Sequence, residues 1–228
     1  MCGNLFCACG SAFGDAMVTE SPERLFDQLS GVAASWTTIA AAAGDVPEEE
    51  SEFLANAVPK RVREFSAGRR LARYVLREFG TEVAAIPAGR DRLPVWPGGY
   101  SGSISHTAER VAVAICRSDR YRGIGLDIET ARSLDRELIR SVLTVEERRH
   151  YPPEAIDPTI LFSCKESVYK AVYPLFREFI EFQDVEIDYR GGTFRANCRP
   201  GKESADWIAL GRGFACLAHD HIVSVFLI

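Results

Sequence analysis

The sequence predicts an α+β protein made of two similar α/β halves. Its 228 residues, 46% hydrophobic and 26% charged, have the composition of a globular protein long enough to bury a sizeable core. Apolar residues recur with helical spacing at residues 60–79 and 159–181, which predicts two long amphipathic helices. Short apolar and β-branched segments flank each of them, so that each half follows the order strand, helices, strands.

Local signals define the elements of the first half. Pro22 and Pro47 suit the first position of a helix, and the glutamates after Pro47 suit its first turn. Gly80 is typical of the end of a long helix. Helices are therefore expected at residues 22–29, from 47 to before 59, and at 60–79. Strands are expected at residues 32–42, 82–86, 103–107 and 111–116, the last two as a hairpin.

The second half is predicted in the same way. Thr144 with Glu147 three residues later is typical of a capping box, and Gly191-Gly192 favours a hairpin turn. Helices are expected at residues 134–142, 145–151 and 159–181, the last with a core face of Leu161, Cys164, Val168, Ala171 and Leu175. Strands are expected at residues 123–129, 185–190, 193–198, 207–210, 214–218 and 222–228.

These elements divide the chain into three parts. We expect a segment of uncertain role at residues 1–31, an N-terminal half at 32–118 and a C-terminal half at 119–228, although no sequence repeat relates the two halves.

Charge and cysteine content restrict the function. The net charge of −5 argues against bulk binding to nucleic acid or to an anionic membrane. No apolar run is long enough to span a bilayer, and the N-terminus lacks the basic region of a secretory signal, so we expect a cytoplasmic protein. The seven cysteines include no C-x-x-C pair and are expected to be free, mostly buried thiols. Metal binding by Cys2, Cys7 and Cys9 is the alternative for the first three.

Two segments carry candidate metal ligands. Asp127 and Glu129 alternate along a predicted strand and therefore point to the same side, where a divalent cation such as Mg²⁺ would relieve their repulsion. Glu166 and Lys170 lie four residues apart on a predicted helix and share a face. Glu166 could complete the metal site and Lys170 could bind a phosphate. A solvated acidic strand end and a surface ion pair are the alternatives.

Candidate anion-binding groups lie in the first half. Ser105 and His106 adjoin at the end of a predicted strand, without the G-x-S-x-G pattern of a hydrolase nucleophile. A basic set accompanies them, consisting of Arg61, Arg69, Arg70, Arg73 and Arg92. Arginine binds phosphate bidentately, so these residues could form a phosphate clamp. A core histidine and a solvated helix face are the alternatives.

Together these motifs resemble a known family. The segments G-I-G-L-D-I-E at 123–129 and F-S-C-K-E-S-V-Y-K-A at 162–171 resemble the paired signature of the 4′-phosphopantetheinyl transferases. The similarity is to the Sfp-type branch and, within it, to enterobactin synthase component D-like enzymes. Supporting segments in the same order are K-R-V-R-E-F at 60–65, G-R-R-L-A-R at 68–73, P-V-W-P at 94–97 and G-S-I-S-H at 102–106.

The resemblance implies a fold and a reaction. The fold is a pseudo-twofold monomer of two similar halves. The reaction moves the 4′-phosphopantetheine arm of coenzyme A to a serine of an apo acyl or peptidyl carrier protein and releases adenosine 3′,5′-bisphosphate. Mg²⁺ is required, with Mn²⁺ as an alternative. The implied partners are carrier domains of non-ribosomal peptide, siderophore or polyketide biosynthesis.

The resemblance also implies residue roles. Asp127, Glu129 and Glu166 would hold Mg²⁺, and Glu166 would also act as the general base on the carrier serine. Lys170 would bind the pyrophosphate, and Lys165 would contribute to coenzyme A binding from the next face of the helix.

The remaining implied contacts are to the phosphates of coenzyme A. Ser105 and His106 match a segment that binds these phosphates, Arg61 and Arg69 match basic positions near the 3′-phosphate, and Arg92 falls in a loop that meets the nucleotide.

Two functions of other classes stay open. A catalytically idle coenzyme A-binding module would use the arginines and Ser105-His106 without a full metal site. A metal-dependent phosphodiesterase would hydrolyse coenzyme A without a carrier. For carrier docking, Leu138, Val142 and Leu143 would either receive a carrier helix or belong to the core.

Overall fold

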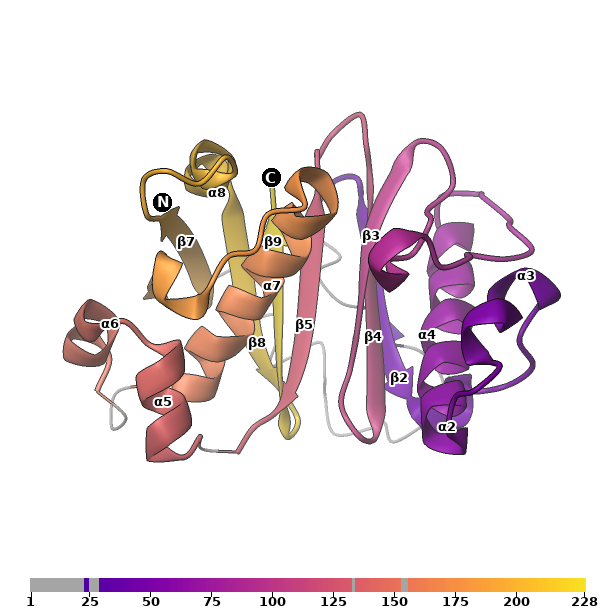
Figure 1. Ribbon diagram of the computed structural model, residues 1–228, viewed down its shortest axis with the longest axis horizontal. Coiled ribbons are helices and arrows are strands. Elements are labelled where there is room, and N and C mark those ends of the chain that lie inside the picture. Colours follow the sequence, from indigo (N-terminus) through magenta and orange to yellow (C-terminus); the bar gives the residue numbers. More distant parts are fainter. Residues whose placement is uncertain (1–22, 25–28, 133, 153–155) are drawn as a thin grey trace. The chain divides into compact units, whose positions relative to one another are not determined.

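The computed structural model describes residues 23–24, 29–132, 134–152 and 156–228. These residues form two compact units, and the chain passes from one to the other within β5 (Ile124–Thr130), between Leu126 and Asp127. Each unit has its own antiparallel strand pairs and its own long helix (Figure 1). The predicted α+β class with two halves is confirmed.

The first unit is built on a four-stranded sheet in the order β1-β2-β4-β3. Its strands are β1 (Glu23–Arg24), β2 (Val32–Thr38), β3 (Tyr100–His106) and β4 (Arg110–Arg117). Its helices are α2 (Ile39–Ala42), α3 (Glu48–Ser51), η1 (Glu52–Leu54), α4 (Pro59–Arg77) and η2 (Arg90–Arg92). Leu71 and Val75 of α4 are buried with Val113 of β4, so the amphipathic pattern fixes α4 on this sheet.

The second unit is built on a five-stranded sheet in the order β5-β9-β8-β7-β6. The strands after β5 are β6 (Val185–Arg190), β7 (Thr193–Cys198), β8 (Arg212–Ala218) and β9 (His221–Leu227). The helices are α5 (Arg136–Val142), α6 (Val145–His150), α7 (Pro158–Phe176), η3 (Phe182–Asp184) and α8 (Ala205–Leu210). The capping box predicted for Thr144 and Glu147 is confirmed.

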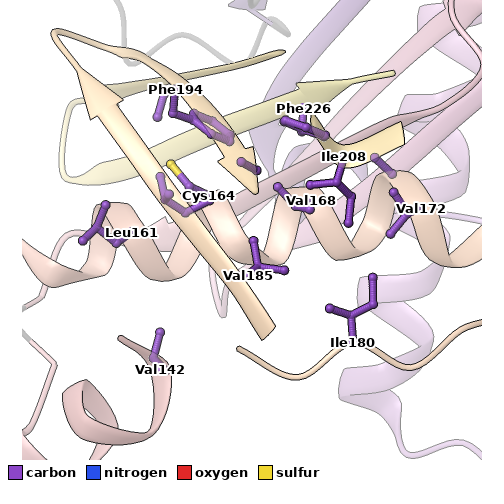
Figure 2. Packing of buried hydrophobic residues seen from close by; sticks show 14 of the residues in the cluster. Val142, Leu161, Cys164, Val168, Val172, Ile180, Val185, Phe194, Ile208 and Phe226 are labelled. Carbon is purple, nitrogen blue, oxygen red and sulfur yellow. The ribbon is translucent and has the colours of Figure 1, made fainter. Parts of the chain in front are cut away.

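Helix α7 supplies the core of this unit. Leu161, Cys164, Val168 and Val172 lie along one side of α7 and pack with residues of the sheet such as Phe194 (Figure 2). Full burial of one such aliphatic side chain contributes about 2 kcal/mol, so this face fixes the orientation of the helix. Leu175, predicted for the same face, is 40% exposed. The helix ends at Phe176 rather than at 181, because Arg177 adopts a left-handed conformation with φ 55°.

Three predicted strands were wrong in whole or in part. Residues 39–42 form α2, whose start is capped by the Thr38 hydroxyl accepting from the Ala41 amide. Residues 82–86 form no strand, and the Ile86 amide donates instead to the carboxylate of Glu50. Residues 207–210 belong to α8.

Little of the predicted N-terminal segment lies in the described part. Residues 23–24 pair with β2 as a strand, which contradicts the predicted helix there, and most of residues 1–31 lie outside the described residues. In the described part of the chain Cys116, Cys164, Cys198 and Cys216 form no disulfide, and all but Cys198 are buried.

A buried carboxylate organises the first unit. Glu50 is completely buried, and its Oε1 accepts from the Arg73 guanidinium and, at 2.7 Å, from the Ile86 amide. Replacing Glu50 by alanine would leave the partly buried Arg73 guanidinium without this counter-charge and the buried Ile86 amide without an acceptor. We expect Glu50→Ala to lower the free energy of unfolding by about 3 kcal/mol, measured by urea denaturation. Glu49→Ala, at an exposed neighbouring position, is the control, and equal losses in both variants would contradict this role.

Candidate active site

The carboxylates of β5 lie where the strand leaves the core. Leu126 and Ile128 are buried in the sheet, whereas Asp127 and Glu129 occupy the alternate positions. The Asp127 side chain is only 2% exposed and accepts a hydrogen bond at 2.5 Å from the Lys170 ammonium. The Asp127 carboxylate is therefore held by a cation of α7 in a site with little solvent.

Helix α7 brings two further charged groups to this place. Glu166 and Lys170 lie one turn apart, with Oε2 and Nζ 3.9 Å from each other, and each side chain is 27% exposed. Lys170 thus lies between two carboxylates from different elements, Asp127 on β5 and Glu166 on α7. The predicted surface ion pair between Glu166 and Lys170 does not describe this arrangement, because Lys170 contacts Asp127 more closely.

Mutual repulsion affects the carboxylates. Burial, followed by the negative charge of Asp127, raises the pKa of Glu129 to about 7. Burial also raises the pKa of Glu166, an effect that the Lys170 ammonium opposes. Asp127, Glu129, Glu166 and Lys170 therefore form one electrostatically connected group, here called the carboxylate cluster.

The carboxylate cluster matches the chemistry of a magnesium site but is not assembled as one. Within the described residues, no three side chains of His, Cys, Asp or Glu are grouped so as to hold a metal ion. The donor set nevertheless fits Mg²⁺ or Mn²⁺, which prefer carboxylate oxygens, and a divalent cation would offset both the burial and the Asp127 charge that raise the pKa of Glu129. The role of Asp127, Glu129 and Glu166 as metal ligands stays a prediction.

The predicted anion-binding residues of the first unit divide into two groups. Arg61 lies 3.4 Å from Nε2 of His106, and Glu64 lies within 3.9 Å of both side chains. Arg61 is half exposed and His106 is 31% exposed, so both can reach a ligand from solvent. Arg92 is exposed as well, at the end of η2, where its φ is 61°.

The second group is buried. Arg69 is 5% exposed and lies over the ring of Phe65, with 4.7 Å between the guanidinium carbon and the ring centroid. Burial lowers its pKa to about 10, an effect opposed by Glu50. Within the described part of the chain, Nε of Arg69 has no hydrogen-bond partner. Ser105 is 7% exposed. The alternative of a solvated helix face is therefore wrong at Arg69, and its role toward a phosphate stays a prediction.

Lys165 is placed differently from Lys170. Its side chain is 1% exposed, and Nζ lies 2.7 Å from Oε2 of Glu147, whose side chain is equally buried. Burial lowers the pKa of Lys165, and the Glu147 carboxylate opposes this effect. The sequence alone did not predict Glu147 as the partner of Lys165, because the capping-box role of Glu147 already explained it locally. The helical spacing did carry a signal for the lysine, since Lys165 lies four residues after Leu161 and three before Val168 on the buried side.

A pocket of about 380 Å³ adjoins Glu166 in the second unit. Its walls come from the end of α5, from α7 and from the connection between α7 and β6. The lining residues are Ser141, Lys165, Glu166, Tyr169, Phe179, Ile180, Glu181, Phe182, Gln183 and Val185. Leu138 is exposed, whereas Val142 and Leu143 are buried, so of the three candidate docking residues those two belong to the core.

Two family comparisons identify the chain. The family described as 4'-phosphopantetheinyl transferase N-terminal domain matches residues 49–116, and the 4'-phosphopantetheinyl transferase superfamily matches residues 123–225. The chain therefore belongs to the 4′-phosphopantetheinyl transferase superfamily, whose members are transferase enzymes. The predicted family, including its Sfp-type branch, is confirmed.

Individual relatives agree with this family. The 4'-phosphopantetheinyl transferase Svp of Streptomyces mobaraensis is 32% identical over 184 residues, covering 74% of this chain and 75% of Svp. The transferase PptT of Mycobacterium tuberculosis is 34% identical over 145 residues, 62% of this chain and 64% of PptT. Enterobactin synthase component D of Salmonella typhi is 41% identical over 125 residues, 52% of this chain and 51% of that protein. The match thus spans just under two thirds of PptT. Among the described helices, none is long and apolar enough to cross a bilayer.

The raised pKa of Glu129 predicts a pH-dependent stability. The folded protein keeps this proton up to about pH 7, whereas the unfolded chain releases it near the ordinary value of 4.5. Stability contributed by the protonated group is therefore lost as the pH rises through this interval. We expect Glu129→Gln to raise the melting temperature of the metal-free protein more at pH 8 than at pH 5.

The same thermal unfolding experiment tests the metal. Added Mg²⁺ should raise the melting temperature of the parent at pH 8 more than that of Glu129→Gln, because the variant has lost one carboxylate. A difference in melting temperature between variant and parent that does not change with pH would contradict the raised pKa of Glu129.

Proposed function

We propose that this protein transfers the 4′-phosphopantetheine arm of coenzyme A to a serine of an apo acyl or peptidyl carrier protein, with Mg²⁺, and releases adenosine 3′,5′-bisphosphate. One structural observation supports the proposal in addition to family membership. The carboxylate cluster lies beside a pocket of about 380 Å³, and Glu166 belongs to both. A charged site suited to a pyrophosphate therefore adjoins a pocket that could hold the pantetheine arm.

The transfer needs charge neutralisation more than covalent catalysis. The carrier serine oxygen forms a bond to the β-phosphorus, and the bond from this phosphorus to the adenosine 3′,5′-bisphosphate oxygen breaks. Mg²⁺ held by Asp127, Glu129 and Glu166 would neutralise the pyrophosphate. Lys170, already held between Asp127 and Glu166, would stabilise the charge that develops on the leaving group.

Glu166 has the properties of a general base. Burial raises its pKa, which favours proton acceptance, and the side chain keeps 27% of its surface exposed for an incoming serine hydroxyl. In the proposed reaction Glu166 accepts the serine proton. The nucleophile belongs to the partner protein, which agrees with the lack of a nucleophile motif in this sequence.

The pocket suits the pantetheine arm. Tyr169 and Phe179, whose ring centroids are 6.2 Å apart, offer apolar surface to its methylene groups, and Gln183 and Ser141 offer polar atoms to its amides. Arg61, Arg69, Arg92, Ser105 and His106 would bind the phosphates of the nucleotide portion.

The relatives suggest the partner class. One of them is named as a component of enterobactin synthase, and the others as 4′-phosphopantetheinyl transferases. We therefore propose carrier domains of siderophore, non-ribosomal peptide or polyketide synthesis as substrates, with the enzyme acting as a cytoplasmic monomer.

The direct test is intact-mass spectrometry of an apo peptidyl carrier domain incubated with the protein, coenzyme A and Mg²⁺. We expect the carrier to gain the mass of phosphopantetheine, and the gain to disappear in a parallel sample with EDTA. Hydrolysis of coenzyme A without a carrier would favour a phosphodiesterase. Binding of coenzyme A without transfer to any of several apo carriers would favour an idle binding module.

The carboxylates are tested by neutral replacements. We expect Asp127→Asn and Glu166→Gln each to lower kcat at least about 100-fold, since one loses a metal ligand and the other the general base. Glu166→Gln should not lower the melting temperature strongly, because it removes a charge from a group of mutually repelling carboxylates. Asp127→Asn also removes the buried ion-pair partner of Lys170, so it should lower the melting temperature more than Glu166→Gln does. Glu203→Gln, at an exposed position, is the matched control. Near-parent activity of Glu166→Gln would show that Glu166 is not the base.

A further inference from the structure

The buried ion pair of Lys165 and Glu147 needs an explanation beyond stability. Both side chains are 1% exposed, with Nζ and Oε2 2.7 Å apart. Desolvation of two charges opposes such a pair, and well-packed apolar residues in its place are often at least as stable. A pair of this kind is therefore weak evidence for a purely stabilising role, and its contacts must be considered one by one.

The ammonium group of Lys165 ties two separate segments together. Besides Glu147, it donates to the carbonyl of Val142 at 2.8 Å and to the carbonyl of Phe182, also at 2.8 Å. Val142 is the last residue of α5, and Phe182 begins η3 in the connection between α7 and β6. All three donors of one ammonium are thereby used, and each reaches a different segment.

Glu147 extends the same set of contacts. Its Oε2 accepts from the amide of Thr144 at 2.8 Å, and its Oε1 accepts from the amide of Ile187 at 2.7 Å. The pair therefore fixes the α5–α6 connection and β6 in addition to the segments held by Lys165.

The segments that the pair holds are the walls of the pocket beside Glu166. Ser141 precedes Val142 at the end of α5, and Phe182 and Gln183 line the pocket from the opposite connection. Gln183 strengthens the junction, since its amide nitrogen donates to the carbonyls of Ser141 at 2.8 Å and Leu143 at 3.1 Å. Val142, Ile180 and Val185, one from each of these segments, lie around α7 in Figure 2.

We propose that Lys165 is a positioning residue, which acts through Val142, Phe182 and Glu147 to hold the two walls of this pocket at the separation that the pantetheine arm requires. The inference rests on the proposed function of the pocket. In it, Lys165 does not contact the phosphates of coenzyme A, and the buried ammonium contributes to the shape of the arm-binding site. Lys170, five residues further along α7 and on another side of the helix, is the lysine that would face the reacting phosphates.

A comparison of two ligands distinguishes binding of the pantetheine arm from binding of the nucleotide. Coenzyme A carries the arm, whereas adenosine 3′,5′-bisphosphate has the same 3′-phosphate and adenosine but no arm. The experiment is calorimetric titration of both ligands, with Mg²⁺ present throughout, into the parent, Lys165→Met, the double variant Lys165→Met/Glu147→Gln, and the control Arg190→Met. The control removes one member of an exposed pair with Asp188.

The double variant is the decisive one. Lys165→Met alone leaves an unpaired buried carboxylate and should lower the melting temperature, whereas the double variant removes both charges and should recover much of it. We expect the double variant nevertheless to bind coenzyme A at least about 10-fold more weakly than the parent, with unchanged affinity for adenosine 3′,5′-bisphosphate. In transfer assays its KM for coenzyme A should rise more than its kcat falls. Arg190→Met should match the parent in both titrations.

Two outcomes would overturn the proposal. The first is parent-like affinity of the double variant for coenzyme A, and the second is an equal loss for both ligands, which would indicate a contact to the nucleotide or a general loss of structure. Failure of the proposed function is seen separately, as a parent that binds the two ligands equally well or transfers no arm to a carrier.

Discussion

Helix α7 packs one apolar face against the five-stranded sheet and also carries the charged residues of the site, and the second unit depends on this double role. One side of α7 buries Leu161, Val168 and Val172 against the five-stranded sheet. The same helix carries two lysines and a glutamate between residues 165 and 170. Because the apolar face fixes the rotation of the helix, each charged residue has its environment decided by its angular position around the axis. The chemistry of the site is thus set by a packing interface that contains no charge.

The two lysines of α7 show how position changes the role of the same side chain. Lys165 lies on the border of the buried face and is enclosed with Glu147. Lys170 lies further round, and its side chain keeps 27% of its surface exposed beside Asp127 and Glu166. A fully enclosed ammonium with three protein acceptors has no donor left for a ligand. A partly exposed one can exchange a carboxylate partner for a phosphate, which is the property that phosphoryl transfer requires.

The first unit uses buried charge in a related way. Glu50 is completely buried and accepts from Arg73 and from the Ile86 amide, so it ties α3 to α4 and to the start of the segment that carries Arg92. Arg69 lies close enough to Glu50 for the carboxylate to oppose the effect of burial on its pKa. In both units a buried carboxylate holds a backbone amide of a connection, and a cationic side chain of the long helix satisfies its charge.

The sequence alone determined the two-half α+β class, the long helices, the capping box at Thr144 and the family, because these depend on local periodicity and on motifs that are contiguous in the chain. Periodicity also placed Leu161, Cys164, Val168 and Ala171 in the core. It failed at residues 207–210, where a short apolar run suits a strand and a helix equally well and tertiary context selects α8.

Only the tertiary structure decided which charges meet. Nothing in the order of residues shows that Glu147 faces Lys165 or that Glu50 lies beneath Arg73, since these partners come from elements whose relative placement depends on packing of apolar side chains. Arg69 and Lys165, both expected to contact a ligand, are buried for the same reason. Sequence patterns specify which face of a helix is apolar, but the depth of burial at the border of that face is set by what packs against it.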